Sequence, residues 1–132
     1  MTEIQSYAQD ISSKNETIQA WKISFMTKRL KLTPQEAQQF WPVYNQFESE
    51  VEELRTNHRK QMQALKEDFS EISDTEIEKF VDGQLTFRQN EIDILKKYNP
   101  QFKKVLPIKK VAMLYKAEEE FIQAIKSYKQ LK

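Results

Sequence analysis

Residues 32–44 read LTPQEAQQFWPVY, and they contain a complete signal for the start of a helix. The Thr33 hydroxyl can accept a hydrogen bond from the backbone N–H three residues later, while the Glu36 carboxylate can reach back to the N–H of Thr33. Pro34 occupies the first helical position, where its missing donor costs nothing and its fixed φ suits a helix. Leu32 precedes this capping box, and the helix is therefore predicted to begin at Pro34.

A second capping box follows later in the chain, within residues 72–77, which read ISDTEI. Ser73 takes the place of the capping hydroxyl and Glu76 the place of the returning carboxylate. Ile72 precedes the box, and Ile77 is placed to contact it as a hydrophobic staple. Two boxes of one design in a chain of 132 residues predict helices that stack on one another.

The composition indicates an all-α protein and excludes several classes of site. One glycine in the whole chain argues against a glycine-rich phosphate loop or a dinucleotide fingerprint. The absence of cysteine excludes disulfides and thiolate metal sites. Charged residues make up 31% and hydrophobic residues 39%, and the regular spacing of the latter is typical of amphipathic helices. No apolar run approaches the roughly 18 residues of a membrane helix, and the first twenty residues lack a signal-peptide core.

We expect about four helices in a single domain over residues 15–132, preceded by a loosely ordered arm over residues 1–14. The helices are predicted at about Asn15–Lys31, Pro34–Phe69, Ser73–Tyr98 and from Pro107 onward. Because few residues join the second and third helices, these should form an antiparallel hairpin. Pro42 predicts a bend inside the second helix, and Asn99-Pro100 is expected to end the third.

The second helix carries an apolar stripe that is too long for the surface of a compact monomer. Its steps of four and three residues predict that one face needs a long partner helix. The nine positions of the stripe are Phe40, Tyr44, Phe47, Val51, Leu54, His58, Met62, Leu65 and Phe69.

The net charge of +1 conceals a strong asymmetry along the chain. Residues 33–95 carry 6 basic and 14 acidic groups, whereas residues 96–132 carry 10 basic and 3 acidic groups. The basic end could bind an acidic partner, or acidic and basic helices could neutralise one another within the fold. Nucleic acid is not expected as a partner, because the lysines lack interleaved arginines and the pI is about 7.8.

Several residues are candidate contacts for a protein partner. Trp41 and Tyr44 mark the expected elbow at Pro42, where Trp41 is either a core anchor or a partly exposed aromatic residue that contacts a partner. The candidate contacts from the aromatic and basic groups are Trp41, Tyr44, Lys103, Lys104, Lys109 and Lys110.

We predict no enzymatic activity, no cofactor and no metal ligands. His58 and Met62 lie four residues apart, so they share one helical face and could contribute to a soft metal site. They supply only two ligands and have Arg55 and Arg59 close by in sequence, which favours a role in packing. General acid–base catalysis requires convergent groups with separated pKa values, whereas the carboxylates here are spread along helical faces.

The residues around the first capping box resemble a known family. Leu32-Thr33-Pro34-Gln35-Glu36 is similar to the Leu-Thr-x-x-Gln signature of the Spy/CpxP family of periplasmic helical proteins in Gram-negative bacteria. Glu36 stands in the place of the signature glutamine. The longer stretch 32–45 and residues 98–121 resemble a subgroup of that family labelled as sensors linked to extracytoplasmic sigma factors.

The resemblance implies a bent long-helix hairpin, often an antiparallel dimer shaped like a cradle, in the periplasm. Known members act as ATP-independent chaperones, as modulators of envelope stress signalling or as metal-responsive sensors. Two hypotheses follow for this chain. In the first, it is a Spy/CpxP-like chaperone or stress sensor that binds an unfolded client or protein partner as a homodimer. In the second, it is a structural helical module that pairs with one specific partner.

Overall fold

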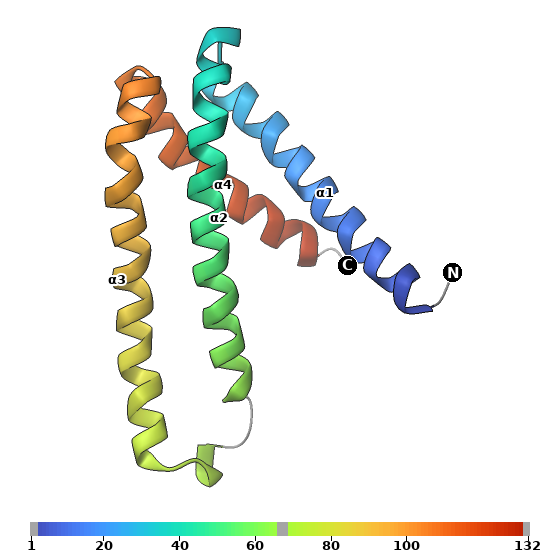
Figure 1. The fold of residues 1–132 in the computed structure, drawn as a ribbon, viewed down its shortest axis with the longest axis vertical. Helices are drawn as coiled ribbons and strands as arrows, with labels where there is room; N and C mark the ends of the chain where they lie inside the picture. The colour runs from blue at the N-terminus through green and yellow to red at the C-terminus, as the bar shows by residue number, and fades with distance from the viewer. Residues whose placement is uncertain (1–2, 66–68, 131–132) are drawn as a thin grey trace. The chain divides into compact units, whose positions relative to one another are not determined.

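The computed structural model describes residues 3–65 and 69–130, and over these ranges the chain is all-α, as predicted (Figure 1). None of the described helices combines the length and the apolar character that crossing a membrane requires. The elements in chain order are α1 (Glu3–Leu30), α2 (Pro34–Ala64), the 3-10 turn η1 (Phe69–Glu71), α3 (Asp74–Val105) and α4 (Ile108–Gln130).

The chain divides into two compact units. Unit 1 combines Met1–Ala37 with Leu106–Lys132, so it contains α1, α4 and the first turn of α2. Unit 2 is Gln38–Val105 and contains the rest of α2 together with η1 and α3. Whether they unfold as the one domain expected over residues 15–132 stays a prediction.

Unit 2 is an antiparallel helical hairpin, which confirms the predicted pairing of the second and third helices (Figure 1). Aromatic rings from both helices form its core. The Phe47 ring meets Tyr98 and Phe102 edge to face, with centroids 5.6 and 5.5 Å apart. Such edge-to-face pairs add to the stabilisation from burial alone. The buried residues of this unit are Phe40, Tyr44, Phe47, Val51, Tyr98 and Phe102.

The nine-position stripe of α2 is buried only in its first half. Phe40 through Val51 lie in the core, whereas Met62 and Phe69 are exposed. The prediction that the helix reaches Phe69 is also wrong, because α2 ends at Ala64. The Leu65 amide then donates to the Met62 carbonyl (3.1 Å), a tight bond of the kind that closes a helix. A hairpin of two helices covers its side chains from one direction only, which leaves this half partly exposed.

α3 continues through Asn99-Pro100 to Val105, so the predicted end of the third helix is wrong. A proline inside a helix costs about 3 kcal/mol, because one hydrogen bond is lost and the ring crowds the preceding turn. Tyr98 and Phe102 flank Pro100, and both are buried in the aromatic core. Burial of these two rings holds the helix across the missing bond. Pro42 likewise lies inside α2, and the bend expected there stays a prediction.

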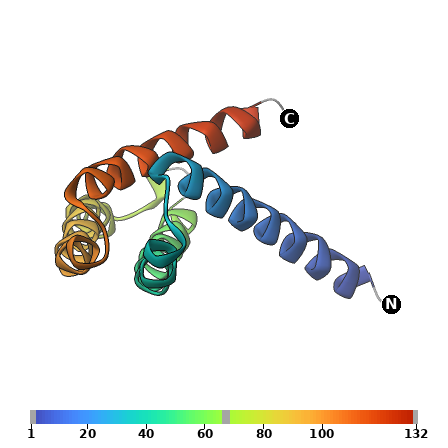
Figure 2. The ribbon, with the colours of Figure 1, turned by 90° about the horizontal axis from the view of Figure 1, so that it is seen from above.

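Unit 1 pairs α1 with α4 in antiparallel order, and Figure 2 shows the two helices separating toward the termini. Phe25 of α1 contacts Phe121 of α4 at 5.5 Å between ring centroids, and Trp21 meets Tyr128 edge to face at 5.1 Å. The core of this unit consists of Met26, Leu30, Leu106, Val111, Leu114, Ala117 and Phe121.

α1 begins at Glu3, twelve residues before the expected start at Asn15. The backbone of the segment that we expected to be a loosely ordered arm is therefore helical from that residue. No proline or glycine occurs before Asn15 to interrupt a helix, so the helix extends toward the N-terminus.

Candidate functional site

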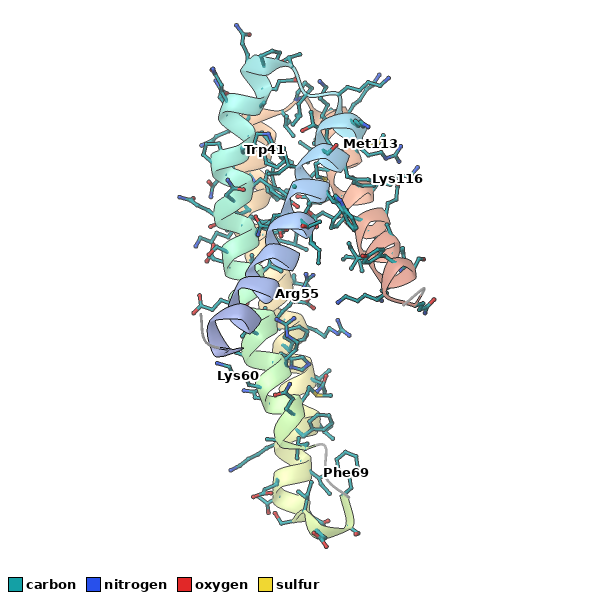
Figure 3. The ribbon with its side chains drawn as sticks, turned by 90° about the vertical axis from the view of Figure 1, so that its right-hand side faces the viewer. Trp41, Arg55, Lys60, Phe69, Met113 and Lys116 are labelled. Carbon is teal, nitrogen blue, oxygen red and sulfur yellow. The ribbon has the colours of Figure 1, made fainter. Side chains whose placement is uncertain are left out.

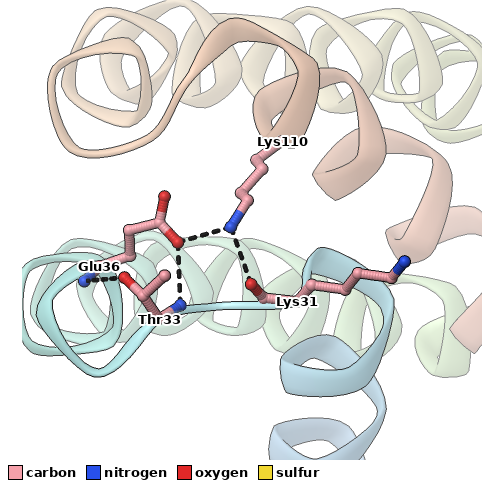
Figure 4. Close-up of polar contacts among 4 residues, drawn as sticks. All are labelled: Lys31, Thr33, Glu36 and Lys110. Atoms are coloured by element: carbon pink, nitrogen blue, oxygen red, sulfur yellow. Dashed lines mark hydrogen bonds and ion pairs between the residues drawn. The ribbon is translucent and has the colours of Figure 1, made fainter.

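The first capping box forms as predicted and lies at a junction of three helix ends in unit 1 (Figure 4). The Glu36 amide donates to the Thr33 hydroxyl (3.1 Å), and the Thr33 amide donates to Glu36 Oε1 (2.9 Å). α1 ends just before it, where Lys31 adopts a φ of 50° and the Leu32 amide donates to the Thr27 carbonyl (3.3 Å). This is the Schellman ending, with lysine where glycine is usual.

Lys110 connects the three helix ends at this junction. Its Nζ atom donates to Glu36 Oε1 (2.6 Å) at the start of α2 and to the Lys31 carbonyl (2.8 Å) at the end of α1 (Figure 4). The lysine itself lies in the first turn of α4. Its charge is therefore used inside the fold, and we withdraw Lys110 as a partner contact.

The junction lowers the pKa of Glu36. The main cause is the hydrogen bond from Lys110, followed by the backbone hydrogen bond from Thr33. A carboxylate whose pKa is lower in the folded state stabilises the fold above its ordinary pKa. That contribution is lost as the pH falls through the lowered value.

We expect Glu36→Gln to reduce the free energy of unfolding at neutral pH, by an amount that shrinks as the pH falls below 4.5, the ordinary pKa of the group. Urea unfolding at a series of pH values measures this difference. Glu76→Gln is the matched control, since it changes the equivalent position of the second box without touching Lys110. A difference between Glu36→Gln and the original protein that does not vary with pH would contradict the assignment.

The second capping box caps α3, which begins at Asp74. The Glu76 amide donates to the Ser73 hydroxyl (3.3 Å), and the Ile77 amide donates to the Ser73 carbonyl (3.0 Å). Both predicted helix starts therefore have the expected hydroxyl contact. These residues position the helices and are not themselves a site for a ligand.

The two aromatic candidates differ in their access to a partner. Tyr44 is only 2% exposed and stacks on Phe40 with 5.2 Å between ring centroids. It belongs to the core, and its interpretation as a partner contact is wrong for the free chain. Trp41 is half-buried and meets both Phe40 and Tyr44 edge to face. Figure 3 labels Trp41 on α2, where one side of the indole is covered by this cluster.

The lysine candidates Lys103, Lys104 and Lys109 are exposed. Lys103 and Lys104 lie in the last turn of α3, where positive charge complements the helix dipole. Lys97, a turn and a half earlier, pairs with Glu50 of α2 (2.9 Å). Both interpretations of the basic end therefore hold in part, because some lysines neutralise acidic groups within the fold and others are exposed.

Glu50 also interacts with a buried hydroxyl in unit 2. The Tyr98 hydroxyl and Lys97 together lower the pKa of Glu50, with the Tyr98 hydrogen bond as the larger cause. The same carboxylate raises the pKa of Tyr98 to about 12. This polar contact links α2 and α3 beside the aromatic core, and it gives no sign of acid–base chemistry near neutral pH.

His58 and Met62 both contact α3. The His58 ring stacks on Phe87 at 3.9 Å between centroids with the planes 9° apart. The Met62 sulfur accepts a hydrogen bond from the Gln84 amide (3.3 Å). These contacts favour the packing role over the metal-site interpretation. Among the described residues, no three histidine, cysteine or carboxylate side chains gather closely enough to hold a metal ion.

The described residues include ten exposed large hydrophobic side chains, and four of them follow one face of α3. The sequence analysis placed these four on the third helix but did not separate them from the face that contacts α2. Spacing contained the missing signal, since positions 81, 85, 92 and 95 repeat the heptad rhythm one residue after positions 80, 84, 91 and 94. The six exposed residues elsewhere are Trp21, Ile23, Met62, Phe69, Ile108 and Tyr128.

Comparison of the chain with models of protein families, with characterised proteins and with solved structures finds no match. The candidate site therefore rests on its own chemistry, namely exposed apolar side chains on helices together with the exposed lysines at the α3–α4 connection.

Proposed function

We propose that this chain is a helical binding protein without enzymatic activity that captures partly unfolded proteins without ATP. The likeness of the first capping box to the Spy/CpxP signature places this activity in the periplasm, in protein folding or in sensing of envelope stress. The observation that carries the proposal is the set of ten exposed large hydrophobic side chains on helices of a small chain.

Physical chemistry supports this activity. Burial of apolar surface is non-directional and needs no specific sequence in the bound chain. Exposed lysines such as Lys103 and Lys109 add a long-range attraction for acidic clients that speeds the encounter. Larger apolar patches on soluble proteins commonly mark sites of interaction with other proteins.

We expect the purified protein, without nucleotide, to suppress the aggregation of reduced α-lactalbumin, an acidic client, at near-equimolar ratio. The chain contains no cysteine, so the reductant that unfolds the client leaves the binding protein unchanged. Light scattering measures aggregation, and stopped-flow fluorescence measures the rate of capture. The triple variant Lys103→Glu, Lys104→Glu and Lys109→Glu should capture this client more slowly, and added salt should slow the original protein likewise.

A matched control moves the same charge change elsewhere. Lys116, Lys126 and Lys129 are exposed on α4, and their triple change to glutamate gives the same net charge away from the α3–α4 connection. Capture slowed equally by both triple variants would mean that only net charge matters. Aggregation that is untouched at several-fold molar excess of the original protein would overturn the chaperone proposal and favour the module that pairs with one specific partner.

A further inference from the structure

α3 carries two apolar faces, and α2 covers only one of them. Phe87 and Tyr98 contact α2 through His58 and Phe47. The second face, which we call the outer stripe, is 39% to 71% exposed. It extends about 21 Å along the helix at 1.5 Å per residue, and consists of Val81, Leu85, Ile92 and Leu95.

The spacing of the outer stripe is typical of a helix that pairs with another helix. Its members, with Arg88 in the middle, are separated by alternating steps of four and three residues. This repeat keeps one seam in line along the helix and inserts its side chains between those of a facing helix. An unfolded client requires no such regularity, so the stripe fits a folded helical partner better.

Charges beside the stripe identify the orientation of that partner. Asp82 and Lys96 are both exposed, and each lies seven residues from Gln89, on opposite sides of it. A second copy of α3 that runs antiparallel and crosses near Gln89 brings Asp82 of each chain opposite Lys96 of the partner subunit. A parallel copy would instead place Asp82 beside Asp82 and Lys96 beside Lys96, which is unfavourable.

The ends of α3 have the same polarity. Asp74 and Glu78 precede the stripe and Lys103 follows it, and all three are exposed. In the antiparallel arrangement the acidic end of one helix lies along the basic end of the other. The net −8 of residues 33–95 and the net +7 of residues 96–132 therefore favour association with a second copy, in addition to neutralisation within one chain.

We propose that the outer stripe of α3 is the interface of an antiparallel homodimer centred near Gln89. This inference rests on the proposed function only in treating exposed apolar side chains as binding surfaces. It leaves the six exposed hydrophobic residues outside the stripe, and the lysines at the α3–α4 connection, for other proteins.

The absence of cysteine allows a direct test. Under mild oxidation, Gln89→Cys should form a disulfide-linked dimer, because the two copies of this position meet near the symmetry axis. Asn90→Cys is the matched control, since it is equally exposed but lies about 100° further around the helix. Equal cross-linking of the two variants would overturn the proposed centre.

Sedimentation of the unmodified chain gives a second test. Leu85→Lys with Ile92→Lys should yield folded monomers, because both side chains are exposed in the single chain. Asp82→Lys should weaken the dimer roughly tenfold at low salt, and Asp82→Lys with Lys96→Asp should restore it. A monomeric original protein would overturn the dimer. Aggregation assays on the same samples test the proposed function separately, since a monomer that still suppresses aggregation refutes the dimer alone.

Discussion

Phe102→Ala should destabilise the hairpin more than any other single truncation in unit 2, by about 3–5 kcal/mol. The Phe102 ring is 0% exposed and contacts Phe40, Phe47 and Tyr98. Its removal takes away the transfer free energy of a large ring and leaves a cavity that the surrounding aromatic rings can fill only in part. Urea unfolding followed by circular dichroism measures the loss.

Phe69→Ala is the control for this prediction. It removes the same atoms from an exposed side chain in η1, labelled in Figure 3, which contacts Phe80 at 6.3 Å between ring centroids. We expect a loss of roughly 1 kcal/mol or less. Comparable losses at the two positions would mean that the aromatic core does not hold the hairpin.

Leu114→Ala should have a similar effect on unit 1, with a loss of about 2–5 kcal/mol, because Leu114 is 1% exposed in the core of α4. This variant also tests how the two units are coupled. The chain contains two tryptophans, and Trp21 belongs to unit 1 whereas Trp41 belongs to unit 2. Trp41→Phe and Trp21→Phe backgrounds therefore allow fluorescence to follow each unit separately.

We expect Leu114→Ala to move both tryptophan transitions together. α2 begins in unit 1 and continues without interruption into unit 2, and coincident transitions are the mark of two-state unfolding. Ile108→Ala, at an exposed position of the same helix, should move neither. A shift confined to the Trp21 signal would show that the units unfold independently and that the single-domain prediction is wrong.

Local sequence predicted the features whose causes are local. Thr33 and Glu36 satisfy each other's amides within one turn, so neighbouring residues suffice to predict where α2 begins. Ser73 does the same for α3. The pairing of α2 with α3 followed from their short connection, and the all-α class followed from apolar spacing and the single glycine.

Local sequence failed where residues distant along the chain decide the outcome. Asn99-Pro100 normally ends a helix, but α3 continues because Tyr98 and Phe102 contact rings of α2. Lys110 was expected on a binding surface, and the fold places it 2.6 Å from Glu36. Neither outcome can be derived from neighbours in sequence, since each depends on a helix that comes from another part of the chain.

The sequence by itself therefore determined the class of the protein, its helix starts and the antiparallel order of α2 and α3, because hydrogen bonds within a turn and short connections act over few residues. Only the tertiary structure decided which apolar side chains are buried. Each helix of the α2–α3 hairpin has a single neighbour within its unit to cover it, so Tyr44 is removed from solvent while Leu85 on α3 stays exposed. That division between covered and uncovered faces of similar helices locates the binding surfaces proposed for this protein.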